Sequence, residues 1–178
     1  MRDFKYFFKI HLRKIVILGL LLFLTSIIIK QCQKEEESTI TLSDISMLDY
    51  SGNLFELDKL DKVEKTIVFF FSPDCDHCEE EIKELLDIHK VFDIANVRWL
   101  FITMDVMKDE LDAFLESYPI DKKPNVYVLL DKGLYYHNLF EVAGSPYVFI
   151  FDKSNKMVHR IIGSFNTSSL MQWIEIEN

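Results

Sequence analysis

Apolar residues in this chain fall either in short continuous runs or in longer stretches where they recur with helical spacing. The runs are rich in β-branched and aromatic residues, which is typical of strands buried on both faces of a sheet. The longer stretches place apolar residues three or four positions apart, as one face of a helix does. From this pattern we predict strands at residues 66–71, 97–104, 125–130, 147–151 and 157–162, and helices at residues 75–91, 108–117, 133–142 and 168–176.

The order of these elements predicts an α/β fold with a mixed sheet flanked by helices. Strands that alternate with helices along a chain form parallel sheets. The turn at residues 153–156, however, should make the last two strands an antiparallel hairpin. Ahead of the alternating part, residues 39–57 predict another hairpin, with two short strands around a turn at residues 50–53.

A different pattern occupies the N-terminus, where residues 15–29 form an apolar run after a basic start. We interpret residues 12–29 as a membrane helix that acts as an uncleaved signal anchor. A cleaved signal peptide and a lipid-modified Cys32 are the alternatives. Because basic residues precede the span, the N-terminus should be cytoplasmic and the rest of the chain should lie outside, on the periplasmic or cell-surface side. The predicted organisation is residues 1–30 as basic start and anchor, 31–38 as a charged linker and 39–178 as the folded domain.

Charge is distributed unevenly along the chain, whose net charge is −9. Residues 38–178 carry 13 basic and 25 acidic residues, so the predicted domain is strongly acidic. Nucleic-acid binding needs basic patches that neutralise phosphates, and we therefore exclude it. The whole chain has three cysteines, which excludes a disulfide-rich scaffold as well.

Two of the cysteines, Cys75 and Cys78, follow the strand predicted at residues 66–71 and open the next helix. The first turn of a helix has unpaired N–H groups and a partial positive charge, and both favour the thiolate, the reactive form of cysteine. Cysteines at this spacing can close a small disulfide ring, and we interpret the pair as redox-active. Half of a zinc site is the alternative. A structural zinc needs four ligands, and the sequence offers no second ligand pair.

Two motifs carry a resemblance to a known family: FFFSPDCDHC at residues 69–78 and GSPYVFIFD at residues 144–152. In both, the chain is similar to the thioredoxin superfamily, and within it to the membrane-anchored TlpA/ResA-like thiol–disulfide oxidoreductases. The resemblance implies a thioredoxin-like fold over about residues 39–176, with residues 125–142 as the central strand–helix insert of this branch. It also implies that Pro146 has a cis peptide bond and faces the cysteines, with Ser145 and Pro146 binding the substrate.

Four residues in and after the first motif are candidates for catalysis. Cys75, the outer cysteine, would attack a disulfide, and Cys78 would resolve the mixed disulfide. The resemblance implies that Glu81, three residues after Cys78, assists proton transfer; an ordinary exposed helix glutamate is the alternative. His77 lies between the cysteines, where a cation would stabilise the Cys75 thiolate, and a solvated surface histidine is the alternative. We expect Glu79 to belong to a solvated face of the helix.

Together, the motifs predict an exported, membrane-anchored thiol–disulfide oxidoreductase that reduces or isomerises protein disulfides. Its partners would be protein dithiols or disulfides and, for a reductase, a membrane electron donor; no cofactor is expected. Two alternatives keep the fold and change the chemistry. One is a copper protein similar to Sco proteins, in which His137 would join Cys75 and Cys78 as a ligand. The other is a peroxiredoxin-like peroxidase, whose motif the position of Pro73 does not match.

Overall fold

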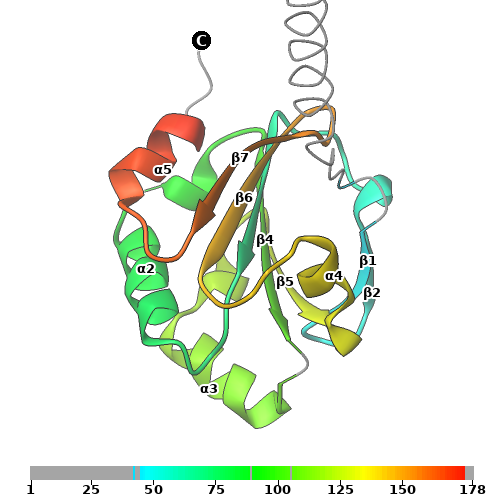
Figure 1. The fold of residues 1–178 in the computed structure, drawn as a ribbon, viewed down its shortest axis with the longest axis vertical. Helices are drawn as coiled ribbons and strands as arrows, with labels where there is room; N and C mark the ends of the chain where they lie inside the picture. Colours follow the sequence, from blue (N-terminus) through cyan, green and yellow to red (C-terminus); the bar gives the residue numbers. More distant parts are fainter. Residues whose placement is uncertain (1–41, 43–44, 89, 105, 175–178) are drawn as a thin grey trace, which may run out of the picture. The chain divides into compact units, whose positions relative to one another are not determined.

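The computed structural model describes residues 42, 45–88, 90–104 and 106–174, and a seven-stranded sheet runs through this part of the chain (Figure 1). These residues belong to one of two units of the chain, Ile40–Asn178. The predicted membrane span at residues 12–29, and Cys32, lie outside the described residues. None of the helices in the described part has the length and apolar character that a membrane crossing needs.

The sheet is mixed, as predicted, and the N-terminal hairpin is part of it. Its strands lie in the order β2-β1-β5-β4-β3-β6-β7. β3 is parallel to β4, and β4 is parallel to β5, while the other neighbouring pairs are antiparallel. The strands are β1 (Ser46–Asp49), β2 (Leu54–Glu56), β3 (Lys65–Phe70), β4 (Val97–Met104), β5 (Val126–Asp131), β6 (Tyr147–Asp152) and β7 (Met157–Ile162).

Helices cover both faces of the sheet (Figure 1). Side chains of α2, α3 and α5 pack with Ile67 and Phe69 of β3 on one face. On the other face, Val68 and Phe70 pack with residues of the hairpin and of the α4 segment. This alternation follows from the period-two geometry of a strand whose two faces are both buried. The α-helices are α2 (Asp76–Asp87), α3 (Lys108–Ser117), α4 (Tyr135–Leu139) and α5 (Thr167–Ile174), and the 3₁₀ helices are η1 (Leu57–Lys59), η2 (Val91–Asp93), η3 (Ile120–Lys122) and η4 (Lys132–Leu134).

The register of β3 brings two distant loops to the same edge of the sheet. Phe70, the last residue of β3, pairs with Ile102 of parallel β4 and with Tyr147, the first residue of antiparallel β6. The chain that leaves β3 therefore passes beside the chain that enters β6. The first loop, residues 71–75, belongs to the first motif singled out from the sequence, and the second loop, residues 144–146, belongs to the second motif.

The helix predicted at residues 75–91 is wrong at its C-terminal end, because α2 ends at Asp87. Ile88 has extended dihedral angles and Lys90 has a left-handed φ of 71°. This turn directs Val91 and Phe92 into the core, where the Phe92 ring lies 5.2 Å from that of Trp99. Burial of two large apolar side chains outweighs the continued helix that the local sequence favours.

The helix predicted at residues 133–142 is shorter than expected, because Gly133 and Leu134 both have left-handed φ angles of 77° and 60°. α4 lacks a capping side chain of its own. Asp131, at the end of β5, takes that role by accepting hydrogen bonds from the backbone N–H groups of Tyr136 (3.1 Å) and His137 (2.7 Å). Its Oδ2 also lies 2.6 Å from Nδ1 of His137. The buried carboxylate thus joins α4 to the sheet.

We predict that Asp131→Ala lowers the free energy of unfolding by about 2–4 kcal/mol, because it leaves two backbone donors and a histidine without their buried partner. Chemical denaturation of the full chain in detergent measures the change. The matched control is Asp112→Ala, which removes an exposed carboxylate 2.6 Å from Lys108 and should change the free energy of unfolding far less. Equal losses in the two variants would contradict the capping role of Asp131.

Candidate active site

The two cysteines of the first motif form a disulfide at the start of α2, with their Cα atoms 5.2 Å apart. Cys75 is the N-cap residue, and its Sγ accepts a hydrogen bond from the backbone N–H of Cys78 at 3.2 Å. In the reduced protein the same donor and the helix dipole would stabilise a thiolate on Cys75. Cys75 is partly exposed, whereas Cys78 is fully buried. An external sulfur can therefore reach Cys75 first.

A short turn at residues 72–74 presents Cys75 at the end of β3. Directly after β3, the N–H of Phe71 donates a hydrogen bond to the carbonyl of Ile102 in β4. The N–H of Cys75 then bonds to the carbonyl of Ser72, whose hydroxyl bonds to the carboxylate of Asp74. Pro73, between them, has no N–H that the turn must satisfy. The turn thus places an exposed carboxylate, that of Asp74, immediately before the reactive cysteine.

The second motif meets the first at Cys75. The peptide bond between Ser145 and Pro146 is cis, as the resemblance implied. The Sγ of Cys75 lies 3.5 Å from the carbonyl oxygen of Ser145. Pro146 is buried, and its carbonyl accepts a hydrogen bond from Gly163 at the end of β7. The structure therefore brings together Cys75, Cys78, Ser145 and Pro146 among the predicted site residues.

Glu81 is not the exposed helix glutamate of the alternative reading, because it is only 5% exposed. It lies one turn after Cys78 on the buried face of α2. Its Oε1 accepts a hydrogen bond from the backbone N–H of Phe165 at 2.7 Å, and its Oε2 has no partner among the described residues. Burial raises the pKa of Glu81, with smaller contributions from Glu84 and Glu80, while the Phe165 bond and His77 oppose the rise.

His77 lies on the solvent side of α2. Its side chain is 69% exposed, and its Nδ1 is 3.5 Å from Oε2 of Glu80, which is itself 77% exposed. An ion pair in this setting is worth little in water. The position fits a surface histidine, and a tuning effect of His77 on Cys75 stays a prediction.

The copper alternative loses its third ligand in the structure. His137 is held at Asp131, and its ring packs edge-on against Phe70 with centroids 4.8 Å apart. Within the ranges that the structure describes, no three His, Cys, Asp or Glu side chains are grouped so that they could hold a metal ion. Cys75, Cys78 and His137 thus do not form a metal site there.

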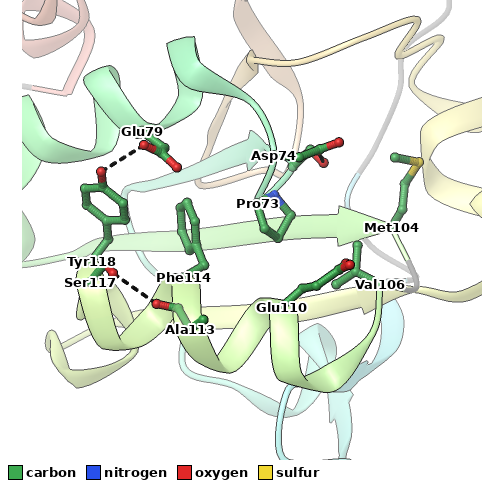
Figure 2. Close-up of a pocket in the computed structure, with 11 residues that line it drawn as sticks. Pro73, Asp74, Glu79, Met104, Val106, Glu110, Ala113, Phe114, Ser117 and Tyr118 are labelled. Carbon is green, nitrogen blue, oxygen red and sulfur yellow. Dashed lines mark hydrogen bonds between the residues drawn. The ribbon is translucent and has the colours of Figure 1, made fainter.

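Sequence reasoning misjudged Glu79, which we expected on a solvated helix face. Glu79 is partly buried, and the hydroxyl of Tyr118 donates a hydrogen bond to its Oε2 at 3.0 Å. This contact closes one end of an open groove between the turn at residues 72–74 and α3 (Figure 2). No local pattern reveals the groove, because its walls come from segments that only the sheet brings together. The backbone donor of Phe165 was missed for the same reason.

Comparison with known proteins agrees with this architecture. A thioredoxin-like domain is matched over residues 59–176. The thiol–disulfide oxidoreductase ResA of Bacillus cereus is 25% identical over 127 residues, which cover 71% of this chain and 70% of that protein.

Solved structures show the same fold at lower identity. A secreted disulfide oxidoreductase of Mycobacterium tuberculosis, homologous to Escherichia coli DsbE, is 15% identical with a TM-score of 0.61, over 74% of this chain and 94% of that one. StoA of Bacillus subtilis is 16% identical with a TM-score of 0.59, over 74% and 96% of the two chains. A protein from Bacteroides thetaiotaomicron described as a disulfide isomerase is 19% identical with a TM-score of 0.63, over 75% and 85%. The matched domain spans well over half of the sequence, and the chain belongs to the thioredoxin-like family.

Proposed function

We propose that this thiol–disulfide oxidoreductase of the thioredoxin fold reduces or isomerises disulfides of proteins outside the cytoplasm, from an anchor formed by its N-terminal segment. The observation that supports it most directly is the order of groups in the site. Cys75, at the start of α2, is accessible to a substrate, whereas Cys78 is buried. The buried carboxyl group of Glu81 lies one turn after Cys78 on the same face of the helix.

In the first step the reduced protein attacks its substrate. The Cys75 thiolate, stabilised by the N–H of Cys78, forms a bond to one sulfur of the substrate disulfide. The substrate S–S bond breaks, and its second sulfur leaves as a thiolate that takes a proton from water. The backbone around Ser145 lies beside the new mixed disulfide, because the Ser145 carbonyl is 3.5 Å from Cys75 Sγ. Contacts between this backbone and the backbone of the substrate would allow many substrate sequences to bind.

In the second step the buried cysteine resolves the mixed disulfide. The Cys78 thiol gives its proton to the Glu81 carboxylate, and the resulting thiolate attacks Cys75 Sγ. The bond between Cys75 and the substrate breaks, and the released substrate thiolate takes a proton from water. The substrate thus leaves as a dithiol after gaining two electrons, and Cys75 and Cys78 are left as the disulfide seen in the structure. A further turnover needs a dithiol donor that reduces this pair. In isomerisation the substrate's own thiol attacks the mixed disulfide instead, and no donor is needed.

The N-terminal sequence supports a location outside the cytoplasm. Residues 15–29 are apolar and follow a basic start, which is the pattern of a signal anchor with its N-terminus inside. Exported proteins meet an oxidising setting in which disulfides form and persist. A disulfide exchanger held at the membrane would meet such substrates there and could receive electrons from a membrane donor.

We expect Cys78→Ser, in a Cys32→Ser background, to accumulate a covalent adduct with a disulfide-containing peptide, because the mixed disulfide on Cys75 can no longer be resolved. Mass spectrometry of the full chain after incubation with the peptide measures the adduct and locates it. Cys75→Ser in the same background is the control and should form no adduct. An adduct on Cys78 in Cys75→Ser, with none on Cys75 in Cys78→Ser, would show that the roles of the two cysteines are reversed.

We also predict that Glu81→Gln slows resolution of the mixed disulfide by roughly 10²-fold, the size of a typical proton-transfer contribution. Glu81 can accept the proton only when it is ionised, and burial raises its pKa above the ordinary value of 4.5. The wild-type rate should therefore rise as the pH increases through this raised pKa. The variant should lack this rise. Stopped-flow measurement of the second step between pH 4 and 8 provides the test.

The matched control for Glu81→Gln is Glu80→Gln, one residue earlier on the same helix but 77% exposed. It makes the same change of charge and should leave both the rate and its pH profile close to wild type. A Glu81→Gln profile that coincides with that of Glu80→Gln would rule out proton transfer by Glu81.

A further inference from the structure

An open groove of about 530 Å³ is lined by the three residues that immediately precede the reactive cysteine. One wall is the turn at residues 72–74, which leads into Cys75, and the other is α3 with the end of β4 (Figure 2). Its volume is in the range of sites that bind a ligand or a few side chains. Neither the proposed chemistry nor the disulfide accounts for this groove.

The middle of the groove is apolar. Phe114 packs below it against Phe71 and Tyr118, with ring centroids 5.2 and 5.0 Å apart. Pro73 is drawn beside the Phe114 ring in Figure 2, and Met104 borders the groove with 39% of its surface exposed. Methionine side chains adapt to varied apolar partners. The groove can therefore accept a large apolar side chain without demanding one shape.

Carboxylates stand at both ends of this apolar floor. Figure 2 shows Glu79 at one end, beside Tyr118, and Asp74 with Glu110 at the other. The Tyr118 hydroxyl holds the Glu79 carboxylate at 3.0 Å. No lysine, arginine or histidine is among the described residues that line the groove. The charged side chains that line the groove are therefore all acidic.

The basic residue at the start of α3 does not offset this charge. Nζ of Lys108 lies 2.6 Å from Oδ2 of Asp112 and 5.4 Å from the ring centroid of Tyr50. Neither Asp112 nor Tyr50 lines the groove. The groove carboxylates therefore remain available to a cation brought by a ligand.

We propose that the groove binds the stretch of a substrate polypeptide next to the attacked cysteine, and that it selects stretches in which a lysine or arginine accompanies a large apolar residue. This inference rests on the proposed function and adds a substrate class to it. Asp74 and Pro73 are one and two residues from Cys75, and a chain advances at most about 3.6 Å per residue. The selected cation thus lies within about three residues of the substrate cysteine.

The test uses three peptides that share one internal disulfide and one leucine beside it and differ at a single position two residues from the cysteine. That position is Lys, Gln or Glu. We expect the reduced full-length protein to reduce them in the order Lys, Gln, Glu, with the Lys peptide roughly tenfold faster than the Glu peptide at low salt. The ratio should shrink in 1 M salt, where the screening length falls to about 3 Å.

Glu110→Lys tests whether the charge preference comes from the groove or from the overall negative charge of the protein. It should remove or reverse the preference, because it puts a cation at one end of the groove. Its matched control is Glu116→Lys, an equal change of charge at an exposed position of the same helix that does not line the groove. The control should keep the wild-type order of the three peptides.

Two results would overturn the inference while leaving the proposed function intact: equal rates for the three peptides, or an equal loss of preference in Glu110→Lys and Glu116→Lys. A protein that reduces none of the peptides, although dithiothreitol reduces its Cys75–Cys78 disulfide, would instead contradict the proposed function and this inference with it.

Discussion

The pairing of β3 with its two neighbours determines where the chemistry of this protein can occur. Phe70 lies opposite Ile102 on one side and Tyr147 on the other, so β3 ends level with the start of β6. The turn that carries Cys75 and the loop that carries Ser145 and Pro146 must then meet, although 70 residues separate Cys75 from Ser145. A shift of one residue in this register would exchange the side chains that β3 presents to its two buried faces. The hydrophobic core therefore specifies the site geometry.

The site adds polar groups to this core at a cost in stability. A carboxyl group as buried as that of Glu81 is expensive unless it is neutral or hydrogen-bonded, and here one oxygen has the Phe165 N–H as partner while the other has none in the described part of the chain. Burial favours the protonated form and so raises the pKa of Glu81. The same burial destabilises the folded protein when Glu81 is ionised, and it raises the basicity of the carboxylate that we propose as the acceptor of the Cys78 proton. Asp131 shows the contrasting case, in which three nearby nitrogen groups satisfy a buried carboxylate and stabilise the insert.

Much of the fold was predictable, because its strands and longer helices have strong local patterns. The bounds predicted for β4, α3 and β7 agree with the structure, and the two motifs led to the family. The ends of α2 and α4 were not predictable, since left-handed residues and a capping carboxylate from β5 decide them. The burial of Glu81 and the groove beside Cys75 depend on contacts between distant segments, which no periodicity encodes. Glu79 illustrates the limit, because its partner Tyr118 lies 39 residues away.

The central claim is that Cys75 and Cys78 form a reversible pair that donates electrons to protein disulfides. Its most direct test is the equilibrium reduction potential of this pair, measured on the full chain in detergent with Cys32→Ser. The carboxylates around Cys75, Asp74 among them, disfavour the thiolate and so the reduced form, while the Cys78 N–H favours it. We predict a potential between about −270 and −180 mV, the range from thioredoxin to protein disulfide isomerase. A value near −120 mV, typical of a dedicated oxidant, or the absence of a reversible disulfide would contradict the account.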